Sequence, residues 1–454
     1  MNRGGDAAGF TGRSGGISPR GRGRVRRILL DNGSPQLLNF GDVAMLHAAV
    51  LRLRAAFPGS HIDVVTEAPE RLAQLCPGVH PVSFKGRELL CRIDTEYGAN
   101  RLGRHPDADP RDLSAISRLL RRRSPHADVW WSKRRIRNCG YDPGPIDGFW
   151  RTVRHADLIV AAGGGYLTDV FPWLATDVLV TLRLAQRAGI PTALMGQGLG
   201  PMAGQTLRRL AAATLGAAKL VGLRERLASL PLLADLHVGL DHVTVTGDDA
   251  VEAATCVDPA PTGEPVNCIG VNIRVADYSN VGEGWLEPLR VAVGGFARDH
   301  HTSLVPLPVA RHAFDDDCDA LRRVLVPPDG GGGRAIDVGE CIVTPTDLIR
   351  QVARCRVVVT GSYHAAVFAL AQGRPVVAMT SSRYYDDKFA GLSDVFGLGC
   401  WIVSGERPDA NALLTAIGQA WHAADAVRAP LMAAAAHMVA VGREAYARLP
   451  ALVR

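Results

Sequence analysis

The segment 357–379 constrains the fold of this chain more than any other stretch. It contains two β-branched apolar runs joined by a helical pattern that ends at Gly373. Buried strands that flank a helix form a βαβ unit, in which both strands run parallel. Ligands of such units lie beyond the carboxyl ends of the strands. The loop Gly361-Ser-Tyr-His364 occupies that edge, so we expect His364 to lie where ligands bind.

The same alternation of strands and helices continues along both halves of the chain. In the first half we expect strands at 28–30, 62–66, 158–162, 192–195, 220–223 and 243–246, with helices at 43–57 and 174–188. In the second half we expect strands at 268–273, 303–307, 341–343, 357–360, 376–379 and 401–403. Such alternation implies parallel sheets covered on both faces. The predicted fold is α/β, with two Rossmann-like domains facing a cleft.

The length of 454 residues exceeds what one hydrophobic core usually supports, which also favours two domains. We place the boundaries as follows: a disordered Arg/Gly-rich tail at 1–27, an N-terminal domain at 28–257 with a basic insertion at 85–154, a linker at 258–265, a C-terminal domain at 266–410, and a C-terminal helical segment at 411–454. We expect the last segment to return across the first domain.

Charge and cysteine usage narrow the class of protein. The net charge of +6 comes from the tail, because residues 1–27 hold seven Arg and one Asp. The body is therefore close to neutral, and we expect no nucleic-acid partner. The N-terminus lacks a secretory signal, and no uninterrupted apolar run approaches the length of a membrane span. Nine scattered cysteines without a Cys-x-x-Cys pair indicate free thiols in the cytoplasm. A peripheral contact with the inner face of the cell membrane is the alternative; the oligomeric state stays open.

The basic insertion departs from the strand–helix rhythm. It carries an excess of seven positive charges, and Trp130, Trp131 and Trp150 are interleaved with the charged residues. We interpret it as a surface insertion with one or two helices. The alternative is a platform for an anionic or lipid-linked acceptor, whose sugar rings would stack on the tryptophans. RNA binding is least favoured, because no recognisable nucleic-acid module surrounds the segment.

Two glycine-bearing loops follow or precede predicted elements in the first half. Asn39-Phe-Gly-Asp42 precedes a helix, so Asp42 is a candidate N-cap, and ligand contact is the alternative. The strand at 158–162 runs into Gly163-Gly-Gly165, where missing side chains let a phosphate or carboxylate approach backbone N–H groups. A tight turn without any ligand is equally compatible with these glycines.

A third loop, Gly196-Gln-Gly-Leu-Gly-Pro201, superficially matches a dinucleotide fingerprint. Pro201 follows its third glycine, and no acidic residue lies near twenty positions further on. We therefore expect no nicotinamide cofactor.

Taken in order, these motifs resemble the polysaccharide pyruvyl transferase family over roughly residues 28–400. The matching stretches, besides the segment 357–379, are Asn39-Phe-Gly-Asp-Val-Ala44, Asp157-Leu-Ile-Val-Ala-Ala-Gly-Gly-Gly165, Gly196-Gln-Gly-Leu-Gly-Pro201, Leu223-Arg-Glu-Arg226, Thr246-Gly-Asp-Asp-Ala250 and Ile269-Gly-Val-Asn-Ile-Arg274. The resemblance implies a GT-B-like fold and transfer of a pyruvyl group from phosphoenolpyruvate to a sugar of a cell-surface or exopolysaccharide glycan, or of a lipid-linked acceptor. The product would be a cyclic ketal, and no metal or cofactor is expected.

That chemistry needs an acid/base group, since a sugar hydroxyl must lose a proton and the enol methylene must gain one. His364 is the best candidate. It lies at the start of a helix, whose dipole disfavours imidazolium, so we expect a neutral imidazole that accepts a proton first. Arg224 and Arg274 end strands in different domains and could hold an anionic donor between them. A structural ion pair is an equally good explanation of each arginine.

The remaining substrate-binding candidates come from the loops at the same sheet edges. They are Asn39, Gly41, Asp42, Gly163, Gly164, Gly165, Gln197, Gly198, Ser362, Tyr363 and Lys388, with Tyr384 and Tyr385 as further lining candidates.

One position departs from the family pattern. The family has Arg two residues before the histidine, where this chain has Ser362. Arg383 and Lys388 are the candidate substitutes for that phosphate contact. The departure keeps two other classes open, namely a GT-B glycosyltransferase with a nucleotide-sugar donor and a non-catalytic glycan-assembly protein.

Overall fold

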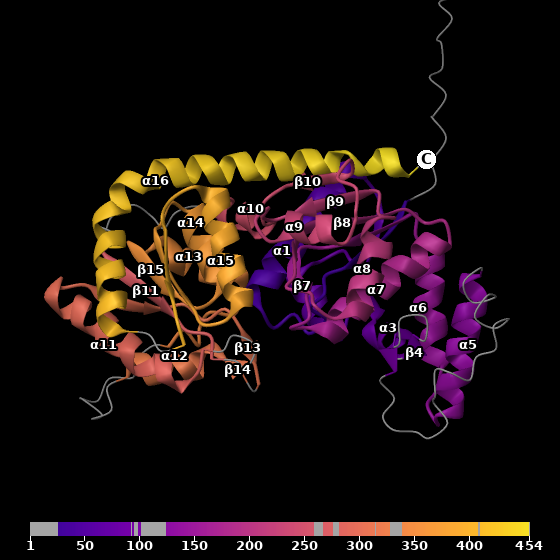
Figure 1. Ribbon diagram of the computed structural model, residues 1–454, viewed down its shortest axis with the longest axis horizontal. Coiled ribbons are helices and arrows are strands. Elements are labelled where there is room, and N and C mark those ends of the chain that lie inside the picture. The colour runs from indigo at the N-terminus through magenta and orange to yellow at the C-terminus, as the bar shows by residue number, and fades with distance from the viewer. Residues whose placement is uncertain are drawn as a thin grey trace, which may run out of the picture.

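Two parallel β-sheets organise the chain in the computed structural model (Figure 1). The structure describes residues 26–453 except 92, 95–98, 101–123, 258–266, 276–280, 314, 327–337 and 407–408. The predicted tail, apart from its last two residues, and the predicted linker at 258–265 lie outside the described residues. The predicted α/β class with two domains of parallel sheet is confirmed.

The larger sheet is built from the first half of the chain. Its strands are β1 (Arg27–Asp31), β2 (His61–Thr66), β3 (His80–Ser83), β6 (Leu158–Ala161), β7 (Gly164–Leu167), β8 (Thr192–Leu199), β9 (Leu220–Leu223) and β10 (Val243–Val245). Their order is β10-β9-β8-β6-β1-β2-β3, with β7 beside β8, and every pair is parallel. The central strands β6 and β8 are buried along their whole length, because helices cover both faces of the sheet.

The second sheet has the order β12-β11-β15-β16-β17, again with parallel pairs. Its strands are β11 (Cys268–Asn272), β12 (Ser303–Pro306), β15 (Val357–Thr360), β16 (Val376–Thr380) and β17 (Cys400–Ser404). Two short antiparallel pairs lie apart from the sheets: β4 (Ile93–Asp94) with β5 (Ala99–Asn100), and β13 (Arg311–His312) with β14 (Asp315–Asp316).

Helices connect the strands and cover the sheets (Figure 1). In the first half they are α1 (Phe40–Ala56), α2 (Pro69–Leu75), α3 (Phe84–Cys91), α5 (Pro125–Asn138), α6 (Gly144–His155), α7 (Pro172–Arg187), α8 (Gln205–Leu215), α9 (Ser229–Asp235) and α10 (Ala250–Thr255). In the second half they are α11 (Leu286–Asp299), α12 (Asp317–Leu325), α13 (Pro345–Ala353), α14 (Tyr363–Ala371), α15 (Arg383–Phe396) and α16 (Ala410–Ala447), with 3₁₀ turns at Glu283–Trp285 and Leu449–Leu452.

The strand predicted at 341–343 is wrong. Ile342 is buried, but Val343 is 63% exposed, and no strand pairs with this segment in the described part of the chain. The residues instead lead into α13, whose N-cap Thr344 forms a reciprocal capping box with Asp347. A β-branched composition alone cannot distinguish such a connection from a strand. Conversely, the short strands β3 and β7 were not predicted.

The predicted cap of α1 is also corrected. Asn39, not Asp42, is the N-cap, and its side-chain oxygen accepts hydrogen bonds from the backbone N–H groups of Gly41 (2.9 Å) and Asp42 (3.3 Å). Asn is as good a cap as Asp, and the cap lies one turn earlier than predicted. The carboxylate of Asp42 is therefore not needed to cap the helix.

The described part of the basic insertion forms three helices, α3, α5 and α6, rather than the one or two predicted (Figure 1). Helix α6 packs against β1 and β3 of the first sheet, and α3 and α5 pack against α6. Trp150 is only 7% exposed and belongs to the core beneath the sheet, so it cannot stack on a sugar as the platform hypothesis required. Trp130 is 58% exposed and meets Trp131 edge to face at 5.8 Å. The insertion is thus an extension of the core with an exposed tryptophan.

The long helix α16 spans both domains (Figure 1), as predicted for the C-terminal segment. It contains Pro430 and packs against α11 of the second domain and against α1 and α10 of the first. Arg52 of α1 contacts Asp249 and Glu252, while Tyr446 of α16 donates a hydrogen bond to Asp249 (2.8 Å). By length and composition alone the segment Ala410–Leu452 could cross a membrane, but core helices meet the same criterion.

Candidate functional site

A cavity of about 650 Å³ lies where the carboxyl ends of the two sheets meet. The strand order of the first sheet reverses between β1 and β6, and that of the second between β11 and β15. Loops at such reversals form the ligand sites of open α/β sheets. The segments that follow β1 and β15 both line this cavity, so each domain contributes its switch point to one site.

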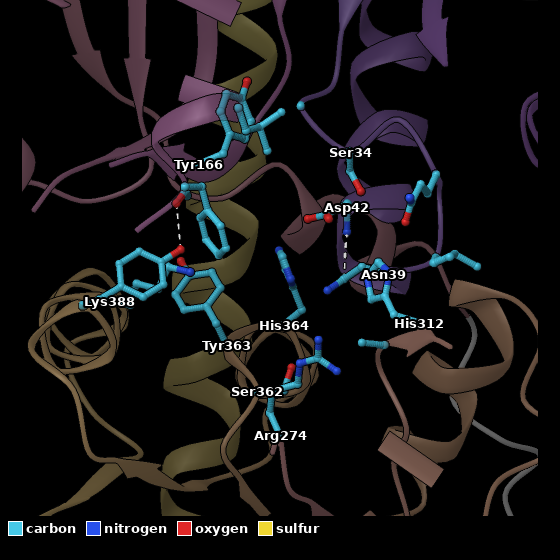
Figure 2. A pocket seen from close by; sticks show the side chains of 18 of the residues that line it. Ser34, Asn39, Asp42, Tyr166, Arg274, His312, Ser362, Tyr363, His364 and Lys388 are labelled. Carbon is cyan, nitrogen blue, oxygen red and sulfur yellow. Dashed lines mark hydrogen bonds between the residues drawn. The ribbon is translucent and has the colours of Figure 1, made fainter. Parts of the chain in front are cut away.

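Nine of the predicted site residues line the cavity together: Asn39, Asp42, Gly165, Arg224, Arg274, Ser362, Tyr363, His364 and Lys388. Tyr384 and Tyr385 line it as well. Figure 2 shows Asp42 and Asn39 on one side of the cavity and Ser362, Tyr363 and His364 below them, on α14. These residues lie on six separate loops and helices, which explains why only the fold brings them together.

Five predicted residues lie behind this lining: Gly41, Gly163, Gly164, Gln197 and Gly198. For these five residues, direct contact with a ligand stays a prediction, and the structure shows a packing role for several of them. A Cβ atom on Gly41 would overlap the imidazole of His364. A Cβ atom on Gly198 would likewise overlap the guanidinium of Arg224. The absence of a side chain at Gly41 and Gly198 lets His364 and Arg224 pack directly against the backbone at these two positions.

Tyr166, which the sequence did not single out, explains the positions of Gly164 and Gln197. Its ring occupies the space that a Cβ atom on Gly164 would need. Gln197 donates a hydrogen bond from Nε2 to the Tyr166 hydroxyl (2.9 Å) and is fully buried. A Cβ atom on Gly163 would lie only 3.0 Å from the sulfur of Met45. The glycine-rich loop thus serves close packing, and Gly165 is the member that reaches the cavity.

His364 lies in the first turn of α14 and is buried, with its Nε2 atom lacking a hydrogen-bond partner among the described residues. Burial, together with the nearby cations Arg224 and Lys388, holds the pKa of this imidazole well below its usual value. A neutral imidazole was predicted from the helix dipole. In the structure, desolvation is the main cause of the low pKa, with like charge adding to it.

Arg224 and Arg274 combine the two roles that the sequence left open. The Nη1 atom of Arg224 lies 3.7 Å from Asp248, and that of Arg274 lies 3.1 Å from Asp317. The guanidinium of Arg224 also lies over the ring of Tyr363, 4.2 Å from its centroid. Both arginines are nevertheless cavity-lining residues. Each arginine therefore lies beside a buried aspartate and also contributes to the cavity wall.

Lys388 is the third cation of the cavity and is held differently. Its Nζ atom lies 3.9 Å from the ring centroid of Tyr384, 5.2 Å from that of Tyr385 and 5.6 Å from that of Tyr363. Nothing in the described ranges forms an ion pair with it. Burial and the nearby Arg224 lower its pKa well below the usual value. Lys388 is thus an amine surrounded by aromatic rings, and the negative charge of a bound anion would favour its protonated form.

Asp42 supplies the acidic group of the cavity. It lies in the first turn of α1 and is half-buried, and burial raises the pKa of its carboxyl to about 6. A hydrogen bond with Ser34 and the charge of Lys388 act in the opposite direction. The cavity therefore pairs a carboxyl group that titrates close to neutral pH with an uncharged imidazole.

Sequence reasoning missed several residues of the lining, among them Ser34, Gln36, Tyr166, Phe171 and His312. Ser34 could have been found, because the Gly-Ser-Pro turn at 33–35 follows the predicted strand at 28–30 at its carboxyl end. His312 could not, because it lies on β13, whose two-residue pairing with β14 is too short to give an alternating pattern. The residues that the structure describes contain no group of three or more His, Cys, Asp or Glu that could hold a metal ion.

Comparison with solved structures identifies the fold. The UDP co-structure of MnaA from S. aureus matches with a TM-score of 0.54 and 13% identity, over 91% of this chain and 94% of that one. The UDP-GlcNAc 2-epimerase from Neisseria meningitidis bound to UDP-GlcNAc gives 0.51 and 12%, over 94% and 98%. A glycosyltransferase from Rickettsia africae ESF-5 gives 0.50 and 11%, over 94% and 97%. Identities this low show the shared GT-B-like fold alone.

Sequence comparison identifies the family. No curated protein gives a significant match. The polysaccharide pyruvyl transferase family, however, matches residues 39–383, which is most of the chain and includes Arg224, Arg274 and His364. Lys388 lies just beyond the matched segment. This chain therefore belongs to the polysaccharide pyruvyl transferase family, a family of transferases.

Proposed function

We propose that this protein transfers a pyruvyl group from phosphoenolpyruvate to two hydroxyls of a glycan or lipid-linked sugar, forming a cyclic ketal. The observation that carries the proposal is the convergence of Arg224, Arg274 and Lys388 on one cavity together with the neutral His364. Membership of the family supports the same reaction class.

The charge of the cavity suits a small, highly charged donor. Phosphoenolpyruvate carries a phosphate and a carboxylate, and guanidinium groups bind both in a bidentate manner. The two arginines come from opposite domains and are fixed by Asp248 and Asp317, so they are preorganised for an anion between them.

Lys388 is the better of the two candidate substitutes for the arginine that Ser362 replaces. It lines the same cavity as Ser362 and His364. Arg383 lies one turn earlier on α15, but its side chain is 85% exposed and lies 3.8 Å from Asp387. Arg383 also lines a different pocket, of about 300 Å³. The phosphate contact is therefore assigned to Lys388 in this proposal.

The reaction requires balanced proton transfers. Two sugar hydroxyls each lose one proton. One proton is balanced by the proton that the methylene carbon of the donor gains, and the second leaves with the phosphate. A neutral imidazole can accept a hydroxyl proton, and general base catalysis of this kind contributes about 10²- to 10⁴-fold to a rate. We assign this step to His364, whose unpartnered Nε2 atom is available for it. No electron transfer is involved, so the proposed reaction needs no redox cofactor.

Aromatic side chains on the cavity wall suit a sugar acceptor. Tyr166, Phe171, Tyr384 and Tyr385 line it beside the cations, and aromatic faces pack well against the apolar faces of sugar rings. We place this acceptor, a glycan or a lipid-linked sugar, on the cytoplasmic side of the cell membrane.

The proposal is tested by calorimetric titration of the purified protein with phosphoenolpyruvate and, in parallel, with UDP-sugars. We expect phosphoenolpyruvate to bind, and Lys388→Ala to weaken that binding while the matched variant Arg383→Ala leaves it unchanged. His364→Ala should retain donor binding but lose pyruvyl transfer by about 10²- to 10⁴-fold. Binding of UDP-sugars without binding of phosphoenolpyruvate would instead identify a nucleotide-sugar glycosyltransferase.

A further inference from the structure

The proposed reaction contains a step for which His364 is unsuited. Protonation of the donor's methylene carbon needs an acid that holds a proton at the start of the cycle. The imidazole of His364 is uncharged in its buried position, and both arginines remain charged under all accessible conditions. A second titratable group is therefore required within the same cavity.

Asp42 has the geometry for this role. Its backbone is fixed in the first turn of α1 by the Asn39 cap, and its side chain lines the cavity. Gly41, the preceding residue, packs directly against the imidazole of His364. Figure 2 shows Asp42 and His364 approaching the same space from α1 and α14. Because the carboxylate is not the helix cap, α1 does not need an acidic group at this position.

We propose that Asp42 is the catalytic acid that protonates the methylene carbon of the donor. This inference rests on the proposed function and adds the second proton-transfer residue to it. The carboxyl group of Asp42 then delivers a proton to carbon, and the imidazole of His364 accepts a proton from oxygen.

The cycle closes in atoms and charge. The carboxyl proton of Asp42 passes to the methylene carbon, and the resulting oxocarbenium ion is attacked by the first sugar hydroxyl, whose proton passes to His364. The C–O bond to phosphate then breaks, and the departing phosphate takes the proton from His364. Attack by the second hydroxyl closes the ketal, and its proton returns to Asp42. The donor trianion thus yields a ketal carboxylate and a hydrogen phosphate dianion.

The groups around Asp42 support a protonated carboxyl group when the donor binds. The charged and titratable groups that face it are Lys388 of α15, Arg224 after β9, Asp248 before α10, His364 of α14 and Tyr166 of β7, with the hydroxyl of Ser34 as hydrogen-bond donor. Burial already raises its pKa to about 6. An anionic donor nearby raises the pKa of a carboxyl group further.

The first test compares Asp42→Asn and Asp42→Glu with the wild type. We expect Asp42→Asn to bind phosphoenolpyruvate at least as tightly as the wild type but to lose turnover by about 10²- to 10⁴-fold. Asp42→Glu should recover part of that loss. Full turnover by Asp42→Asn would overturn the proposal. Failure of the wild type itself to bind phosphoenolpyruvate would instead overturn the proposed function, so the two failures are distinct.

The second test separates an acid from a merely structural carboxylate. If protonated Asp42 is the reactive form, kcat/KM of the wild type falls as pH rises above about 6. Ser34→Ala removes a hydrogen bond that stabilises the carboxylate, so it should move this falling limb to higher pH. A limb that stays in place in Ser34→Ala would overturn the acid role, even if Asp42→Asn were inactive.

Discussion

The cavity and the basic insertion both combine cations with aromatic rings, but they hold them in different surroundings. In the cavity, Arg224 and Arg274 are 3% and 4% exposed, and each lies beside a buried aspartate. In the described part of the insertion, Lys133 pairs with Asp147 at 2.6 Å on an exposed surface, and Arg134 lies over the exposed ring of Trp130. The insertion has the larger net charge. Its Arg87 is buried and paired with Asp31, but Lys133 and Arg134 lie at the surface, whereas both arginines of the cavity are removed from water.

This difference in exposure matters because water weakens the interaction between two charges. Two unit charges 4 Å apart interact by about 1 kcal/mol in water and by about 4 kcal/mol at the effective dielectric constant of about 20 that describes charges in and near proteins. Exposed pairs are also screened by salt and contribute little to stability. We therefore expect substitutions in the cavity to have large effects on donor binding, and substitutions in the insertion to have small ones.

The largest effect is expected for Arg274→Ala. It removes the proposed contact to the donor and takes away the cation that lies beside the buried Asp317. We expect the Kd for phosphoenolpyruvate to rise at least about 30-fold. We also expect the free energy of unfolding to fall by about 3–5 kcal/mol, as for other broken buried pairs. Urea denaturation and calorimetric titration measure the two effects.

The double variant Arg274→Ala/Asp317→Asn is the control for this prediction. Neutralising Asp317 should restore part of the lost stability without restoring donor affinity. Recovery of both stability and donor affinity would show that Arg274 acts only through its ion pair with Asp317. The charges of the cavity would then be no more important for donor binding than those of the insertion.

An intermediate effect is expected for Lys388→Met. Loss of one hydrogen bond to a charged group should weaken donor binding by about 10- to 100-fold. Burial depresses the pKa of Lys388, and a bound anion raises it again by favouring the charged amine, so binding of an anion should draw a proton from solution. Wild-type affinity should therefore weaken as pH rises, and titrations in buffers of different ionisation enthalpy should show proton uptake that Lys388→Met reduces. Equal uptake by both proteins would assign the proton to another group, Asp42 first.

The sequence was sufficient for most strands of the two sheets and for the edge of the sheet where the cavity lies. Continuous apolar runs such as 28–30 and 357–360 mark strands buried on both faces, and ligand loops follow their carboxyl ends. His364, Arg224 and Arg274 were found in this way. The error at 341–343 has the same origin, because an apolar run beside a capping Thr gives the same local signal as a strand.

The sequence could not give the features that depend on distant contacts. The aspartate that holds Arg274 lies 43 residues further along the chain, and the one near Arg224 lies in a different loop. The burial that raises the pKa of Asp42 comes from elements of both domains. The packing roles of Gly41 and Gly198 follow only from the position of His364 and Arg224 against the backbone. Local pattern shows which residue types are present, and tertiary packing decides their ionisation.

The smallest effect is expected for Trp130→Ala in the insertion. The side chain is 58% exposed, and substitutions at such positions usually change the free energy of unfolding by less than about 0.5 kcal/mol. Trp130 does not line the cavity, so donor affinity and the acceptor KM should stay within about twofold of the wild type. Steady-state kinetics with varied acceptor measure this directly, with Tyr384→Ala as the matched aromatic variant that lines the cavity. A selective rise in acceptor KM for Trp130→Ala would show that the insertion binds the acceptor after all, and that exposed aromatic rings there contribute where exposed charges do not.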